Sequence, residues 1–202
     1  SLIAMRCVEL MHQAGLPKGV LALLPGDGAE VGSVISSDPR IAGAAFTGST
    51  QTAFLISRAL AARNAPLAPL VAETGGQNVM LVDSTALPEQ VVRDVLHSAF
   101  ASAGQRCSAL RILLLQEDIA GRVLELLGGA MAELQVGDPS RRDTDLGPVI
   151  DAEAREALQA HIEEFRSRGR LIAETPLPAG LDGHFVAPVA LRLERLDELD
   201  RE

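Results

Sequence analysis

The sequence predicts that two polar residues lie on glycine-containing turns, where together they could carry out covalent catalysis. Cys107 follows Gly104 in a short segment between a helix-like run and an apolar, strand-like run, where a thiol can reach a substrate. Upstream, Glu73 follows an apolar run and precedes Gly75 and Gly76. A thiol and a carboxylate placed in this way predict a nucleophile and its general base.

Both residues also fit purely structural roles. A free cysteine is mostly protonated at neutral pH, and it needs a cation, a helix N-terminus or a base before it can attack. Arg106 is the neighbouring cation, but adjacent side chains of a loop often point apart, so Cys107 could equally be a partly buried structural cysteine. Glu73 is a useful base if the preceding apolar run removes it partly from water, and an ordinary solvated glutamate otherwise.

A third candidate site is the turn formed by Thr47, Gly48 and Ser49. It joins an apolar strand ending at Phe46 to a helix, and backbone N–H groups at the start of a helix can bind an anion. Gly48 would let a ligand approach the backbone, and the Ser49 hydroxyl could cap the helix or donate to a phosphate. An ordinary strand-to-helix turn with a serine cap fits the same residues, and the six-residue glycine fingerprint of dinucleotide folds is absent.

Short apolar strands and helices alternate along the chain and position these turns. Strands are expected at residues 20–24, 41–46, 69–72, 79–82, 111–115, near 171 and at 185–189, and helices at 3–14, 30–36, 49–63, 87–100, 118–134 and 152–168. This order is typical of an α/β fold with a parallel sheet and crossover helices. Cys7 falls on the apolar stripe of the first helix, so we expect it in the core.

The composition limits the partners of the chain. A net charge of −9 argues against nucleic acid as a partner of this segment, because phosphate binding needs clustered lysine and arginine. No apolar run is long enough to span a bilayer, no signal peptide is recognisable, and the two cysteines show no metal-type spacing. We therefore expect a cytoplasmic protein without a metal site. The four histidines lie in no motif, which leaves a cysteine hydrolase without support.

Taken in order, these segments resemble the aldehyde dehydrogenase superfamily. Residues 46–50 (Phe-Thr-Gly-Ser-Thr) resemble its cofactor-helix motif, residues 73–78 (Glu-Thr-Gly-Gly-Gln-Asn) its general-base motif, and residues 104–107 (Gly-Gln-Arg-Cys) its nucleophile motif. Residues 72–78 and 102–111 are also similar to the glutamate-semialdehyde (1-pyrroline-5-carboxylate) dehydrogenase branch, including the module found in bifunctional bacterial proteins of proline breakdown. The resemblance covers essentially the whole chain. One departure is Ala53, where the cofactor motif usually ends in glycine.

The resemblance implies an α/β, aldehyde-dehydrogenase-like fold in two lobes. Residues 1–72 would form the C-terminal part of a Rossmann-like NAD-binding lobe, and residues 73–202 most of a catalytic lobe that is incomplete at its C-terminus. Cys107 would be the nucleophile and Glu73 the general base. The implied cofactor-binding residues are Phe46, Thr47, Gly48, Ser49 and Gly75, and the implied substrate-binding residues are Arg106 and Ser108.

The implied reaction is the NAD-dependent oxidation of L-glutamate γ-semialdehyde to L-glutamate through a cysteine thiohemiacetal and a thioester. FAD would belong only to a separate proline dehydrogenase region of a bifunctional, homo-oligomeric parent. The family's oxyanion amide would precede Ser1, and the segment that anchors the substrate carboxylate would follow Glu202, so we expect the isolated chain to be inactive. Four alternatives stay open: oxidation of another aldehyde, a non-catalytic assembly module, a cysteine hydrolase that works without NAD, and the use of NADP.

Overall fold

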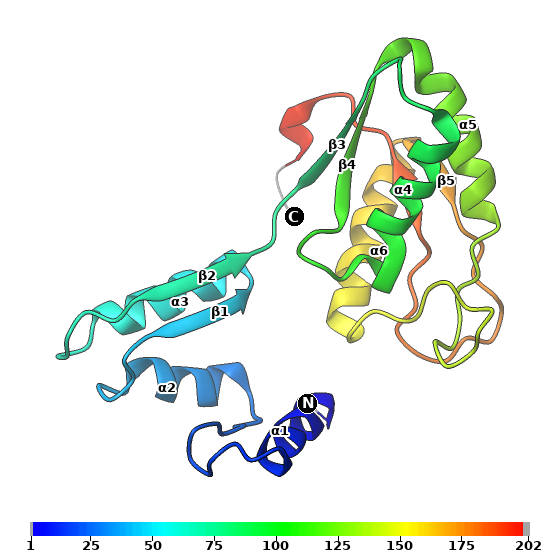
Figure 1. Cartoon of the computed structure of the whole chain (residues 1–202). Coiled ribbons are helices and arrows are strands. Elements are labelled where there is room, and N and C mark those ends of the chain that lie inside the picture. Colours follow the sequence, from blue (N-terminus) through cyan, green and yellow to red (C-terminus); the bar gives the residue numbers. More distant parts are fainter. Residues whose placement is uncertain (1, 200–202) are drawn as a thin grey trace. The chain divides into compact units, whose positions relative to one another are not determined.

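The computed structural model describes residues 2–199, which divide into two compact units between Thr74 and Gly75 (Figure 1). Each unit contains a parallel pair of strands joined by a helix, so the predicted α/β organisation is confirmed. The assignment of the units to a cofactor lobe and a catalytic lobe stays a prediction. Among the described residues, no helix combines the length and apolar composition needed to cross a membrane.

The first unit is built around a strand–helix–strand motif. Its elements are α1 (Leu2–Gln13), a π-helical turn (Gly28–Gly32), α2 (Ser33–Ser37), β1 (Ala44–Gly48), α3 (Thr50–Ala61) and β2 (Leu70–Thr74). β1 and β2 run parallel, with α3 as the crossover. Both strands end two residues later than predicted, because their ladder continues through the pairs Thr47–Glu73 and Gly48–Thr74. Glu73 therefore belongs to a strand, and its predicted position on a turn is wrong.

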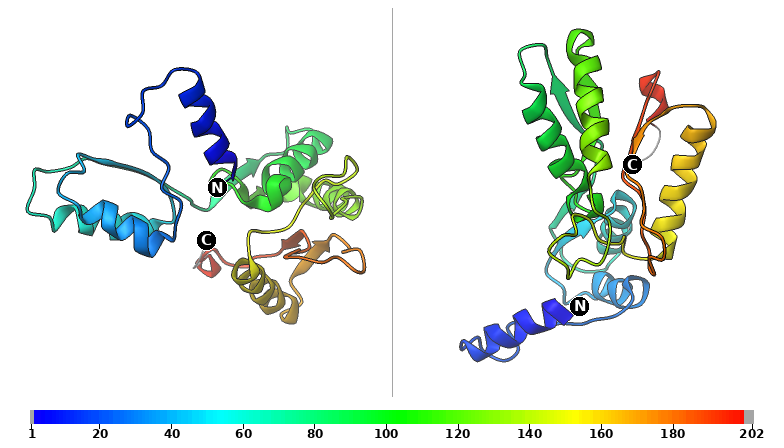
Figure 2. Two further views of the ribbon diagram at one scale, coloured as in Figure 1. Left: turned by 90° about the horizontal axis from the view of Figure 1, so that it is seen from below. Right: turned by 90° about the vertical axis from the view of Figure 1, so that its right-hand side faces the viewer.

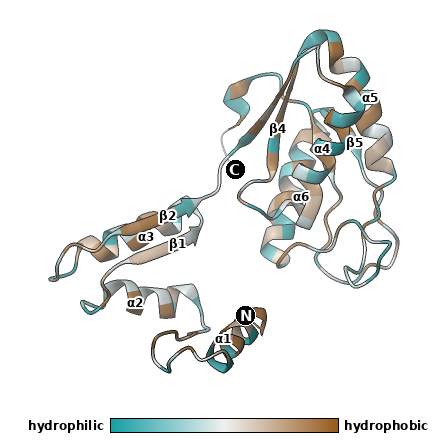
Figure 3. Cartoon of the chain, viewed as in Figure 1, coloured by the Kyte–Doolittle hydropathy of each residue, from teal (hydrophilic) through white to brown (hydrophobic). Residues whose placement is uncertain are grey.

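Two further predictions for the first unit are also wrong. Residues 20–24 form no strand, because an apolar run becomes a strand only beside a partner and no strand of the described residues pairs with this run. Cys7 is exposed instead of lying in a core. No residue of α1 is buried, although hydrophobic residues occur along it (brown parts of the ribbon in Figure 3). Periodicity predicts an amphipathic helix, but it does not show what covers the apolar face.

The second unit contains a parallel and an antiparallel strand pair. β3 (Asn78–Val82) and β4 (Leu110–Leu115) are parallel and joined by α4 (Pro88–Phe100), whereas β5 (Leu171–Glu174) and β6 (Val189–Leu191) are antiparallel. The remaining helices are α5 (Glu117–Ala132), α6 (Ala152–Ser167) and short 3₁₀ turns at Ala101–Gly104 and Leu196–Glu198. Figures 1 and 2 show α4 and α5 side by side. α4 packs on β4, whereas α5 packs on α4 and β5, and side chains of both helices join those of β3 and β4 in one core.

Aliphatic side chains fill the core of the second unit, between the β3–β4 pair and the helices α4 and α5. On α5, buried residues recur every four positions, which places them on one stripe of the helix. Thr175 is fully buried, and its hydroxyl donates to the Met131 carbonyl at 2.8 Å, which ties the end of β5 to α5. The core residues are Val82, Val91, Val92, Val95, Leu110, Ile119, Val123, Leu127 and Met131.

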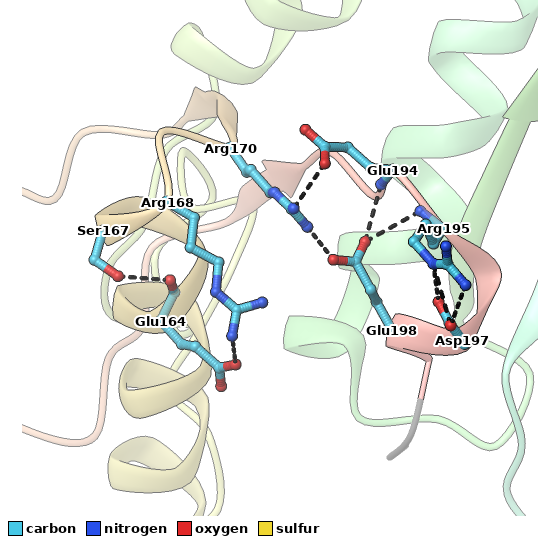
Figure 4. A network of polar contacts seen from close by, with 8 residues as sticks. All are labelled: Glu164, Ser167, Arg168, Arg170, Glu194, Arg195, Asp197 and Glu198. Atoms are coloured by element: carbon cyan, nitrogen blue, oxygen red, sulfur yellow. Dashed lines mark hydrogen bonds and ion pairs between the residues drawn. The ribbon is translucent and has the colours of Figure 1, made fainter.

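An ion-pair network anchors the last described segment to the rest of the second unit (Figure 4). The guanidinium of Arg170 donates to the carboxylate of Glu198 and, at 2.9 Å, to that of Glu194. The Glu198 carboxylate also accepts the backbone N–H groups of Glu194 at 2.9 Å and Arg195 at 3.2 Å. The side chains of Arg170 and Glu198 are only 16% and 17% exposed, so this pair is partly shielded from water.

The Arg170–Glu198 pair predicts an acid-labile anchor. The Arg170 guanidinium and the two N–H groups lower the pKa of Glu198 from 4.5 to about 2, because they stabilise the ionised carboxylate more than the protonated form. The anchor should therefore be intact above pH 4.5 and weaken as the pH falls towards 2. Hydrogen exchange at the amides of Glu194 and Arg195, corrected for intrinsic rates, would measure this. Equal protection in wild type and Glu198→Gln above pH 4.5 would contradict the prediction.

Candidate active site

The carboxyl ends of β1 and β2 carry two of the predicted motifs side by side. The strand register pairs Thr47 with Glu73 and Gly48 with Thr74, so the predicted cofactor turn and the predicted base share one edge of the sheet. Ligands of open parallel sheets bind at this edge. A Cβ atom at Gly48 would lie 2.5 Å from the ring of Phe46, so a side chain at this position would displace that ring. Glu73 itself is exposed in this structure.

The N-terminus of α3 follows directly after this edge. The Ser49 hydroxyl accepts the N–H of Thr52 at 3.1 Å, so the predicted helix-capping role of Ser49 is confirmed. Thr50 and Gln51 are exposed, and their N–H groups at the first helical turn have no acceptor within the helix. Ala53 is buried, so α3 accommodates its methyl group in place of glycine. The N–H groups and the helix dipole at this helix start favour an anion, and the contact with a cofactor phosphate stays a prediction.

Cys107 lies on an exposed turn between α4 and β4. The N–H of Ala109 donates to the carbonyl of Arg106 at 3.0 Å, which closes the turn around Cys107 and Ser108. Ala109 is fully buried, whereas the thiol-bearing residue is exposed and forms no disulfide. The alternative prediction that Cys107 is a partly buried structural cysteine is therefore wrong. An accessible free thiol on such a turn can attack a substrate carbonyl.

An unusual backbone leads into this turn. Ser102, Ala103 and Gly104 have successive φ values of +59°, +52° and +69°, in the left-handed region. Such conformations are unfavourable for residues with side chains, and each costs on the order of 1–2 kcal/mol. A Cβ atom at Gly104 would lie 2.8 Å from the Ala99 carbonyl oxygen, so glycine is required where the chain leaves α4. The surrounding structure must hold this strained segment in place.

The side chain of Gln105 links this strained segment to a loop that follows later in the sequence. Its amide nitrogen donates to the carbonyls of Ser102 at 3.1 Å and Pro148 at 3.3 Å. Its amide oxygen accepts the N–H of Ile150 at 2.8 Å. Gln105 thus fixes the approach to Cys107 from the N-terminal side. The sequence motif contained this glutamine, but nothing in the spacing indicated its partners.

The two predicted substrate residues lie on either side of Cys107. Arg106 donates to the carbonyls of His97 at 3.2 Å and Ser98 at 3.5 Å, near the C-terminal end of α4, where a cation is favourable. Ser108 is exposed on the turn. Their substrate contacts, like the cofactor contact of the half-buried Gly75, stay predictions. The described residues contain no group of three or more histidine, cysteine or acidic side chains that could hold a metal ion.

Comparison with known proteins assigns the chain to a family. The family described as "Aldehyde dehydrogenase family" matches residues 1–199. The chain belongs to this family, and the aldehyde-dehydrogenase-like fold predicted from the three motifs is confirmed.

Its relatives include proteins named bifunctional protein PutA and proteins named 1-pyrroline-5-carboxylate dehydrogenase. It is 50% identical to the bifunctional protein PutA of Klebsiella aerogenes over 210 residues, which is all of this chain but only 16% of that relative. A crystal structure of a Bradyrhizobium japonicum proline utilization A mutant superimposes with a TM-score of 0.93 at 51% identity, covering 99% of this chain and 20% of that one. A Thermus 1-pyrroline-5-carboxylate dehydrogenase with bound NAD gives 0.85 at 35% identity, covering 93% and 37%.

Proposed function

We propose that this chain supplies the nucleophile and the general base of an NAD-dependent dehydrogenase that oxidises L-glutamate γ-semialdehyde to L-glutamate. The observation that carries the proposal is the free, exposed thiol of Cys107 on a turn of a chain from the aldehyde dehydrogenase family. The similarity to a 1-pyrroline-5-carboxylate dehydrogenase with bound NAD supports the choice of substrate and cofactor. We place the reaction in a reducing compartment such as the cytoplasm, because the thiol must stay reduced to react.

In the first half of the proposed reaction, Cys107 forms the covalent bond. Its thiolate attacks the aldehyde carbon, and the carbonyl oxygen becomes an oxyanion that accepts a hydrogen bond from the Cys107 backbone N–H. Loss of hydride from the resulting thiohemiacetal carbon, for which NAD would supply the acceptor, leaves a thioester on Cys107. The turn is exposed, so a substrate can reach the thiol, and Ser108 would donate a hydrogen bond to the substrate carboxylate.

In the second half, Glu73 acts as the general base. Its carboxylate takes a proton from a water molecule as the water oxygen attacks the thioester carbonyl. The carbon–sulfur bond then breaks, the product leaves as a carboxylic acid, and Cys107 returns as a thiolate. Gly48, Ser49 and the first turn of α3, at the sheet edge where Glu73 lies, are the residues that would hold the cofactor phosphate.

NADH formation by the full-length protein with different aldehydes tests the substrate. We expect kcat/KM for glutamate γ-semialdehyde to exceed that for acetaldehyde and succinate semialdehyde by about 100-fold or more, because a site that pairs polar groups of its substrate rejects analogues lacking them. Preference for another aldehyde would keep the mechanism and reject the substrate. Absence of turnover with every aldehyde would contradict the proposal and favour a non-catalytic module.

A further inference from the structure

The side chain of Asn78 spans the turn that carries Cys107. Asn78 is the first residue of β3, and its amide nitrogen donates to the carbonyl of Cys107 at 2.8 Å and to that of Ala109 at 2.9 Å. An amide NH₂ group has two hydrogens, so each carbonyl receives one. If the amide group were flipped, its oxygen would face the two carbonyl oxygens and no hydrogen bond could form. The hydrogen-bond pattern therefore permits only one orientation of this side chain.

A bulge in the sheet accompanies this arrangement. The register of the β3–β4 pair shifts directly after Asn78, which leaves Arg111 as an extra residue on β4. The guanidinium of Arg111 donates to the carbonyl of Gly104 at 2.8 Å. The turn is thus held on its N-terminal side by Arg111 and on its C-terminal side by Asn78. Within β3 the backbone ladder holds the strand to β4, and at the first residue of β3 the Asn78 side chain supplies the hydrogen bonds to the turn.

We propose that Asn78 is a positioning residue for the nucleophile, an inference that rests on the proposed function. Fixing the Cys107 carbonyl fixes the peptide plane that follows this residue and so restricts the direction of its Cα–Cβ bond. Cys107 is exposed, and packing alone does not hold it. Reacting atoms must meet within a narrow range of distance and angle, and a misplacement of about 1 Å can cost roughly 100-fold in rate.

The test compares Asn78→Asp, Asn78→Ala and Asn78→Ser in the full-length protein. Aspartate has the shape of asparagine but turns an acceptor oxygen towards the two carbonyls, alanine removes the contact, and serine keeps one donor. We expect kcat to fall by about 100-fold for aspartate, by about tenfold for alanine and less for serine. The dissociation constant for NAD should stay near the wild-type value, and each variant should remain folded at the assay temperature. The rate of Cys107 alkylation by iodoacetamide should change in the same order.

Asn64→Asp is the matched control. Asn64 is the one other asparagine of the chain and is exposed in the turn after α3, so its replacement makes the same change in charge and should leave kcat unchanged. A folded Asn78→Asp variant with wild-type kcat and alkylation rate would overturn the proposal. If that variant does not fold, equal kcat values for Asn78→Ser and Asn78→Ala would overturn it instead.

The outcome also separates this inference from the function on which it rests. A wild-type protein that oxidises no aldehyde contradicts the proposed function, but the order of the alkylation rates still tests whether Asn78 positions the thiol. An active wild type with unaffected Asn78 variants overturns only the positioning role. A loss of activity that follows the melting temperature alone, with NAD binding lost in parallel, would make Asn78 a structural residue and also overturn the proposal.

Discussion

Replacing Cys107 with alanine in the full-length protein is expected to lower NADH formation by about 10⁴-fold or more while NAD binding remains. Without the sulfur no thiohemiacetal forms, and the hydride would have to leave an unactivated aldehyde hydrate. The change should not disturb the fold, because Cys107 is exposed and the hydrogen bonds of its turn involve backbone carbonyls and the Asn78 side chain. Steady-state NADH absorbance and NAD titration would measure the two quantities.

Cys7→Ala provides the matched control for this experiment. Cys7 is the other cysteine of the chain, and it is also exposed and free, but it lies on α1 outside the proposed machinery. Full activity in Cys7→Ala together with loss in Cys107→Ala would assign the nucleophile. Substantial turnover by Cys107→Ala would remove Cys107 from the mechanism.

The sequence predicted the helices more accurately than the strands. A helix satisfies its own backbone, so local signals such as Pro88 at the first turn of α4 and the Asp151 cap of α6 are enough to place its ends. A strand depends on a partner distant in sequence. β1 and β2 therefore ran two residues past their predicted ends, and residues 20–24, which have no partner among the described residues, form no strand.

For the candidate site too, the sequence predicted some features and not others. The order of the three motifs predicted candidate catalytic and cofactor-binding residues, and glycine at position 104 indicated the turn before Cys107. The contacts that hold this turn could not be predicted, because they depend on the register shift after Asn78 and on the left-handed backbone at Ser102 and Ala103. Neither feature leaves a periodic signal in the sequence.

Replacing Glu73 with glutamine should separate the two halves of the proposed reaction. Glutamine keeps the size of the side chain but cannot accept a proton from water, so hydrolysis of the thioester should slow by about 100- to 10⁴-fold. Formation of the thioester precedes this step. The variant should therefore release a rapid burst of NADH, at most one per active site, followed by slow turnover. Stopped-flow absorbance would record the burst, and intact-mass spectrometry would detect the acyl group on Cys107.

The exposed Glu156 on α6 offers a control of the same chemistry, since Glu156→Gln makes the same change in charge outside the proposed site and should leave both phases intact. A Glu73→Gln variant with neither burst nor acyl-enzyme would mean that Glu73 acts before the thioester forms, for example by deprotonating Cys107. Unchanged steady-state turnover would exclude Glu73 as the base. Residue 73 pairs with Thr47 through the backbone of the β1–β2 ladder, which glutamine leaves intact, so we expect the variant to fold. A missing burst or a slow steady-state rate would then report on the reaction and not on misfolding.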